Sequence, residues 1–317
     1  MTVNRVWLAR VQPIILAYVL ALVLFVVTSA FASGFASWNH SQTLLVQASF
    51  IGTVALGQTF VIIGGGVDLS VPWTLNASAT LLTLWSGGHD SALVWVLPVL
   101  LAGAALVGLV NGLGVAFLGV PPIVMTLGVN GILQGGLLLI TQGGQSPRSP
   151  HAIVWLATGR LAGIPVALLV WLALTLGASV LLSRTVFGRR LYATGTNATA
   201  ASFSGVRVRR VTAAGYVISA LASAIAGIML AGYVGQSYLG LGDVYLFSSV
   251  AAVVIGGASI LGGGGHYVGT VAGALILTIL AGLLPILNLN PAALQVVYGL
   301  VILATVGAAS IRFGGSA

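Results

Sequence analysis

The chain contains no cysteine and no lysine, and its only acidic residues are Asp68, Asp90 and Asp243. Without cysteine, a disulfide framework, a thiol nucleophile and a cysteine-ligated metal site are all excluded. Charged residues make up 4% of the 317 residues, whereas a soluble globular domain carries about 25%. A chain with so little charge cannot build a polar surface, so the composition excludes a soluble protein.

Apolar residues are what the chain has in abundance. They make up 58% of the sequence, and the mean hydropathy is +1.13. A helix needs about 20 apolar residues to cross a bilayer. The first run, 11–31, is longer than a signal-peptide core and is interpreted as a retained span. We therefore predict one all-α polytopic transmembrane domain, residues 1–317, with about ten spans at 11–33, 43–63, 70–86, 92–118, 121–141, 164–183, 211–232, 247–263, 267–284 and 291–311.

The arginines predict the orientation of these spans. Six of the eleven arginines lie in the segment 184–210. Cytoplasmic loops carry an excess of positive charge, so this loop and both termini are predicted to be cytoplasmic. Only Arg148 and Arg160 then lie outside, in the longest external loop, 142–163, for which we expect irregular structure. The arginines flank apolar spans, so they do not indicate a nucleic-acid partner.

Glycine-rich segments predict helix breaks near 64–70 and 262–266. In the first, three glycines precede Asp68, Ser70 and Pro72. We expect Asp68 or Ser70 to cap the next helix. Non-helical backbone inside a membrane must be buried in protein or line a solvated path. Gly65, Gly66, Asp68 and Ser70 are therefore candidates for a translocation pathway, and the capping role is compatible with it.

The second break leaves two alternatives open for residues 247–284, which form either two spans or one re-entrant hairpin. His266 lies in this break and is interpreted as an interfacial polar residue rather than a proton carrier.

Three polar residues within predicted spans, Asn111, Thr126 and Asn130, are the best candidates for a polar conduit. A neutral solute needs hydroxyl and amide partners more than charges. The alternative is that each residue bonds across helices, which contributes about 0.6 kcal/mol on average.

The middle of the arginine-rich segment predicts a short helix. Asn197 can cap a helix from Ala198 to Ser204, and Gly205 can end it. Contact with anionic lipid would explain the arginines alone. An alanine-rich helix that carries Phe203 on one face is a better fit to a partner's groove.

Four segments resemble one family, the permease subunits of bacterial ABC importers of the ribose and other monosaccharide type. They are GGGVDLSV (64–71), PPIVMTLGVNGILQGG (121–136), FGRRLYATGTNATAASFSGV (187–206) and IGGASILGGGGHYVGTVAGAL (255–275). Each match is weak alone, but the four occur in the family's order. The wider family includes branched-chain amino-acid and nucleoside permeases.

The resemblance implies a multi-pass protein of the bacterial cytoplasmic (inner) membrane that carries a monosaccharide. It implies a separate ATPase subunit that binds ATP and magnesium, a second permease subunit and an external substrate-binding protein. In the family, a coupling helix docks on the ATPase. The corresponding residues here are Gly188, Arg189, Asn197, Ala200, Ala201, Phe203 and Gly205.

The sequence departs from the family's pattern at two places. Thr199 and Ser202 stand where many members carry an acidic and a basic residue. Either docking here is less ionic, or the other permease subunit carries the stronger contact, which would favour a heteromeric pair. Pro72 and Trp73 replace the usual glycine and small residue.

The segment Gly262–Gly265 lacks the Lys-Ser/Thr of a phosphate-binding loop, so we expect no ATPase activity and no bound cofactor in this chain.

Two other classes of function, a secondary transporter and an intramembrane enzyme, fit less well. A secondary transporter usually relies on intramembrane acids or histidines, and only Asp68 could serve. HExxH and GxSxG motifs are absent, which argues against an intramembrane enzyme.

Overall fold

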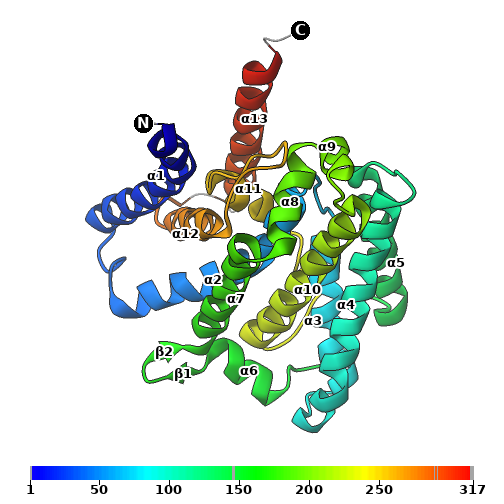
Figure 1. Ribbon diagram of the computed structural model, residues 1–317. Coiled ribbons are helices and arrows are strands. Elements are labelled where there is room, and N and C mark those ends of the chain that lie inside the picture. The colour runs from blue at the N-terminus through cyan, green and yellow to red at the C-terminus, as the bar shows by residue number, and fades with distance from the viewer. Residues whose placement is uncertain (1, 145–146, 289, 291, 315–317) are drawn as a thin grey trace.

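The computed structural model describes residues 2–144, 147–288, 290 and 292–314, and these residues are mostly helical (Figure 1). The elements in chain order are α1 (Thr2–Phe31), α2 (Trp38–Ile63), α3 (Val71–Ser86), η1 (Asp90–Ala92), α4 (Leu93–Ala116), α5 (Pro122–Thr141), α6 (His151–Thr158), β1 (Arg160–Leu161), β2 (Ile164–Pro165), α7 (Val166–Arg184), α8 (Val186–Thr196), α9 (Ala198–Phe203), α10 (Val208–Val234), α11 (Tyr245–Ile255), α12 (Tyr267–Leu283) and α13 (Ala292–Gly314).

The helices confirm an all-α polytopic membrane protein. Each of the ten predicted spans contains one helix. Within the described residues, six helical segments are long and apolar enough to cross a bilayer, namely those of α1, α2, η1 with α4, α5, α7 and α10. Three shorter apolar segments are Tyr245–Ile255, Tyr267–Leu283 and, within α13, Ala292–Ala304.

The eighth predicted span, 247–263, is wrong as a single crossing helix. α11 ends at Ile255 and has 11 residues, which corresponds to a length of about 16 Å. A bilayer core is about 30 Å thick. The helix stops because Gly257 adopts a φ of +87°, a conformation that favours glycine. The second break therefore begins earlier than predicted and covers residues 256–266.

α2 and α10 form the centre of the molecule. α10 packs against α2, α3 and α4, and glycines allow the close approach. A Cβ on Gly57 would lie 2.5 Å from the Ser219 Cα, and one on Gly108 would lie 2.5 Å from the Tyr216 carbonyl oxygen. Since lipid is as apolar as leucine, such close packing is a main source of stability between membrane helices.

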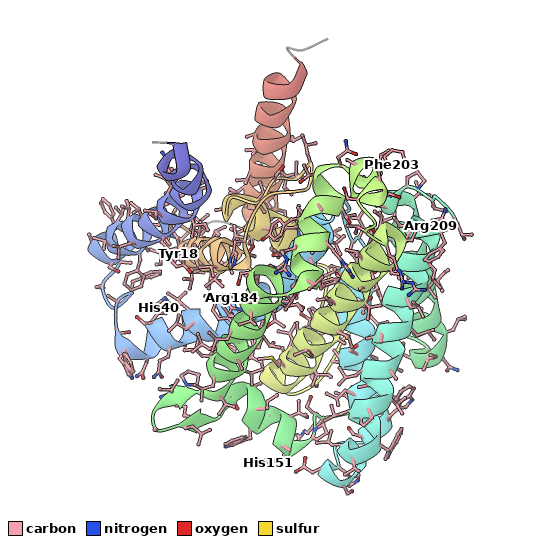
Figure 2. All side chains as sticks on the ribbon, viewed as in Figure 1. Tyr18, His40, His151, Arg184, Phe203 and Arg209 are labelled. Atoms are coloured by element: carbon pink, nitrogen blue, oxygen red, sulfur yellow. The ribbon has the colours of Figure 1, made fainter. Side chains whose placement is uncertain are left out.

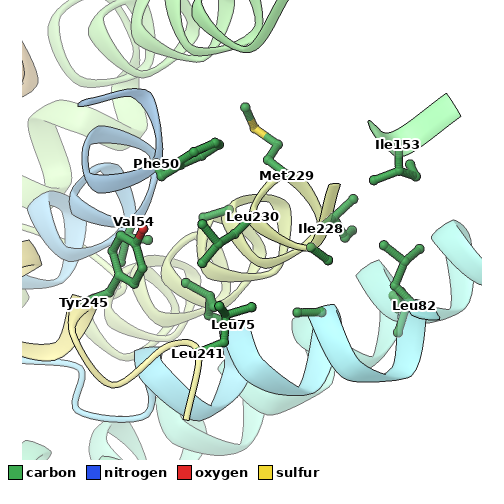
Figure 3. Close-up of a cluster of buried hydrophobic side chains, with 14 of the residues drawn as sticks. Phe50, Val54, Leu75, Leu82, Ile153, Ile228, Met229, Leu230, Leu241 and Tyr245 are labelled. Atoms are coloured by element: carbon green, nitrogen blue, oxygen red, sulfur yellow. The ribbon is translucent and has the colours of Figure 1, made fainter. Parts of the chain in front are cut away.

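A large apolar cluster fills the space between these helices (Figure 3). α2 contributes Phe50 and Val54, and α10 contributes Met229 and Leu230. These side chains are buried and contact residues of α3, α6 and α11.

The expectation of irregular structure for the external loop 142–163 is wrong in part. The segment contains α6 and the β1–β2 hairpin, in which Arg160 pairs with Pro165. Backbone and side-chain bonds fix its start to α10, since the Ser149 hydroxyl donates to the Ala231 carbonyl at 2.6 Å. The Asp90 carboxylate accepts from the Ala152 backbone N–H at 2.9 Å.

The two ends of the molecule differ in what they carry. α9 lies at one end, and α6 with the β1–β2 hairpin lies at the other (Figure 1). The first turn of α1 and the last turn of α13 point toward the end where α9 lies. Residues 1 and 315–317 lie outside the described part of the chain.

Candidate functional site

The first helix break forms where glycines end α2. The Gly65 N–H donates to the Ile62 carbonyl and the Gly66 N–H donates to the Val61 carbonyl, both at 2.9 Å. With Gly65 at a φ of +88°, this is a Schellman motif, which ends a helix while satisfying its last carbonyls. Residues 64–70 are then non-helical, with turns at 64–65 and 69–70, before α3 begins, as the sequence predicts.

Asp68 organises the start of α3. Its Oδ1 accepts from the Ser70 N–H at 2.9 Å and from the Ser70 hydroxyl at 2.6 Å. Asn111 of α4 donates to the Ser70 Oγ at 2.8 Å. Ser70 is the residue at the N-cap position, but its side chain makes no capping bond. Of the two predicted capping residues, Asp68 is therefore the one whose side chain holds the turn.

The backbone of the break is also tied to two neighbouring helices. Thr126 of α5 accepts from the Leu69 N–H at 2.9 Å. Gln58 of α2 accepts from the Asp68 N–H at 3.3 Å and donates to its carbonyl at 3.4 Å. Thr126 was predicted to be a site residue. In the sequence, Gln58 is one of several polar residues in a predicted span, and no local pattern indicates that it faces the break.

Four buried polar atoms gather around Asp68: Asp68 Oδ2, Asn111 Oδ1, Tyr216 Oη and Ser219 Oγ. Tyr216 and Ser219 of α10 lie beside the carboxylate. All four side chains are at most 1% exposed. We refer to Asp68, Ser70, Asn111, Tyr216 and Ser219 as the Asp68 cluster. A buried carboxylate with neutral neighbours is costly unless its hydrogen bonds are satisfied.

Asn130 does not join this cluster. It is half-buried on α5, one turn beyond Thr126, and its Oδ1 has no partner in the described structure. Of the three predicted conduit residues, the structure thus brings Asn111 and Thr126 to the break, and both are fully buried.

The arginine-rich segment folds as two short helices, α8 and α9. The Thr185 hydroxyl accepts from the Gly188 N–H at 3.2 Å at the start of α8. Asn197 Oδ1 accepts from the Ala200 N–H at 2.9 Å and caps α9, as predicted. α9 ends one residue earlier than predicted, at Phe203, through a second Schellman motif around Gly205, whose φ is +79°.

The predicted coupling residues divide by exposure. Arg189, Asn197, Ala200 and Gly205 are exposed, whereas Gly188 and Ala201 are buried. Gly188 packs closely against the carbonyls at the end of α7. Phe203 is 88% exposed and projects from the end of the molecule (Figure 2).

A groove of about 680 Å³ lies beside Phe203. Its walls come from α9, from the end of α4 and from the start of α10, and include Thr199, Ser202, Phe117, Arg207 and Arg209. The Arg209 guanidinium lies 5.5 Å from the centre of the Phe117 ring. The lining of the groove thus combines apolar side chains with arginines.

A smaller cavity of about 250 Å³ joins this segment to the helix break. One wall is formed by Gly65 and Gly66, and another by Leu191 of α8 and Ala198 of α9. Tyr216, a member of the Asp68 cluster, also lines it. The coupling segment and the break therefore share one space.

His266 caps α12. Its Nδ1 accepts from the Val268 N–H at 3.1 Å, which requires an unprotonated nitrogen. Burial lowers the pKa of this imidazole below its ordinary value, so the ring is neutral at pH 7. This capping bond supports the interpretation of an interfacial polar residue.

The cap predicts a pH-dependent effect on stability. Replacing His266 with alanine should lower the free energy of unfolding by about 1 kcal/mol. His266→Asn should keep most of the stability that the cap contributes. Because folding lowers the pKa, the stability that His266 contributes is present above the unfolded pKa of about 6.5 and is lost as the pH falls through the folded value. Thermal unfolding in detergent should therefore show a smaller difference in unfolding temperature between the native protein and His266→Ala at pH 5.5 than at pH 7.5. An equal difference at both pH values would contradict the assignment.

Comparisons with known proteins agree with this arrangement. The family described as branched-chain amino acid transport system / permease component matches residues 41–306. The ribose import permease protein RbsC of Escherichia coli K12 is 32% identical over 96% of this chain and 94% of its own length. The probable ABC transporter permease protein YphD of the same organism is 35% identical over 90% of this chain and 85% of its own.

A further relative is the autoinducer 2 import system permease protein LsrD of Yersinia enterocolitica, 34% identical over 71% of this chain and 70% of its own. No solved structure matches the chain significantly. The family match covers most of the sequence, and several relatives exceed 30% identity over most of both chains. The chain therefore belongs to the family of branched-chain amino acid transport system permease components and is a transport subunit.

Proposed function

We propose that this chain forms one half of the translocation pathway of an ATP-driven importer for a monosaccharide. The observation that carries the proposal is α9, an alanine-rich helix capped at both ends that presents an exposed Phe203 beside a groove. An exposed aromatic side chain at an end of a membrane protein that lies outside the bilayer is a typical anchor for a partner protein. In this role α9 is the coupling helix on which a separate ATPase subunit docks.

The charge distribution supports a cytoplasmic location for α9. Six arginines lie in the 184–210 loop, whereas Arg148 and Arg160 lie near α6 and the hairpin. Under the positive-inside rule, α9 and both termini face the cytoplasm. The membrane is then the bacterial inner membrane, and the end with α6 and the hairpin receives the substrate-binding protein.

The solute assignment rests on the relatives and on the neutral polar groups near the break. RbsC is named for ribose import and LsrD for autoinducer 2 import. The break contributes amides, hydroxyls and one carboxylate, and Gly65, Gly66, Asp68, Ser70, Asn111, Thr126 and Asn130 are the residues that we assign to the pathway region. A second permease subunit, identical or homologous, would complete the path.

ATP and magnesium belong to the ATPase subunit in this proposal. The chain itself binds no cofactor, and energy reaches it through α8 and α9. Surrounding lipid contacts the apolar outer faces of α1, α4 and α5.

A competition experiment tests the solute class. Membrane vesicles that contain the permease, its ATPase and its binding protein should take up labelled ribose in the presence of ATP. Excess unlabelled monosaccharide should inhibit this uptake, whereas excess leucine or adenosine should not. Uptake of labelled leucine with no uptake of any monosaccharide would overturn the solute assignment and leave the permease assignment intact.

A further inference from the structure

Three glycine-containing segments, far apart in the sequence, meet at one point. They are residues 63–66 at the first break, residues 195–196 at the end of α8, and residues 262–265 in the second break. The Gly263 N–H donates to the Ile63 carbonyl at 2.9 Å. The Tyr192 hydroxyl of α8 donates to the Gly265 carbonyl at 2.7 Å. We call this contact the glycine junction.

Apart from the Tyr192 hydroxyl, the close contacts of the junction are mainly between backbone atoms. A Cβ on Gly195 would overlap the Ile63 carbonyl oxygen and lie 2.6 Å from the Gly263 nitrogen. A Cβ on Gly262 would lie 2.8 Å from the Gly195 carbonyl oxygen and 2.9 Å from the Gly65 Cα. Side chains can change rotamer when neighbours move, whereas backbones in direct contact must move together or separate. Close-packed contacts of this kind transmit displacement.

Each segment of the junction is continuous in sequence with a different functional element. Residues 195–196 pass directly into Asn197, the cap of α9. Residues 63–66 pass into the Asp68 cluster. Residues 262–265 pass into His266, the cap of α12. The coupling segment therefore touches both helix breaks at the same place, although they lie about 200 residues apart.

We propose that the glycine junction transmits movement of α9 to both helix breaks at once, and that Gly195 and Tyr192 are positioning residues for ATP-driven transport. The inference rests on the proposed role of α9 as coupling helix. Gly195 is the decisive position because its backbone conformation is helical, unlike those of Gly65, Gly262 and Gly263, whose φ values are +88°, +90° and +72°. Alanine at 195 therefore changes the contact without straining its own backbone.

The absence of cysteine allows a direct test by spin labelling. With cysteine-free partner subunits, one label pair, Arg190→Cys and Leu261→Cys, spans the junction. A second pair, Leu261→Cys and Leu139→Cys, relates the second break to α5. Residues 139, 190 and 261 are all exposed. Distances are measured by pulsed electron paramagnetic resonance in nanodiscs that contain the whole complex, without nucleotide and with ATP and vanadate.

We expect the junction pair to keep its distance within about 2 Å while the second pair changes by several ångströms, on the scale of helix shifts in switching proteins. In Gly195→Ala, ATP hydrolysis should continue while the second pair no longer responds to ATP. The matched control is Gly177→Ala in α7, where a Cβ meets nothing within 4 Å, and it should respond as the native protein does.

Each outcome is decisive for one claim. A junction pair that separates on ATP binding in the native complex, or a Gly195→Ala variant that responds like Gly177→Ala, would overturn the inference. If Gly195→Ala fails to assemble, Tyr192→Phe replaces it, since this variant removes only the hydroxyl that donates to the Gly265 carbonyl. It should show a partial loss of the response, and an unchanged response would overturn the inference. Failure of the native chain to bind an ATPase subunit would instead refute the proposed function.

Discussion

Replacing Phe203 with aspartate should abolish stable binding of the ATPase subunit. An anchoring aromatic side chain in a protein interface contributes about 2–4 kcal/mol, which corresponds to a loss of affinity of roughly 30- to 1,000-fold. Phe203 is 88% exposed, so the substitution should leave the folding of this chain unchanged. The measurement is the affinity of the purified ATPase subunit for the permease in nanodiscs, together with thermal unfolding.

Two control variants separate the ring from the charge. Phe203→Leu retains an apolar side chain and should retain most of the affinity. Ser204→Asp places the same charge one residue further along the exposed surface and should bind nearly as well as the native protein. Native affinity in Phe203→Asp would show that the ATPase docks elsewhere.

Replacing Asp68 with alanine should destabilise the chain strongly and abolish uptake. The substitution removes the acceptor for the Ser70 N–H and hydroxyl, and each buried group left unsatisfied costs about 1–3 kcal/mol. A total near 3 kcal/mol would lower the unfolding temperature by roughly 5–10 °C. The measurement is thermal unfolding in detergent, followed by uptake in vesicles.

Asparagine at this position distinguishes a structural role from a charge-dependent one. Asp68→Asn keeps an oxygen that can accept from Ser70, so the turn and the assembly with partners should be retained. Uptake close to the native rate would confirm that the carboxylate mainly holds the turn. Normal assembly with no uptake would show that the charge itself acts in gating or in solute passage.

The scarcity of charge and the glycine patterns predict much of the fold. Ten apolar runs correspond to ten helices, and the caps at Asn197 and Gly205 follow from local chemistry that one residue and its neighbours determine. The extent of α11 was missed because an apolar run from 247 to 263 does not reveal which glycine takes a positive φ. Gly257 takes it, and α11 therefore ends at Ile255.

The sites were harder to predict because they depend on contacts between distant segments. Asp68 and Ser70 lie two residues apart in sequence. The bonds from Asn111 to Ser70 and from the Leu69 N–H to Thr126, however, require the packing of α4 and α5 against the break. Nothing in the sequence indicates that Tyr192 and Gly195 contact residues 262–265, since a glycine that packs against a remote backbone resembles any other glycine in a helix.

The central claim is that ATP hydrolysis in a partner subunit drives this chain. Its most direct test is ribose uptake into proteoliposomes that contain the permease, the ATPase and the binding protein. We predict uptake that requires ATP, that persists when an uncoupler and a sodium ionophore dissipate the ion gradients, and that is lost in Phe203→Asp. Uptake that continues without ATP and collapses with the uncoupler would contradict the account and identify a secondary transporter.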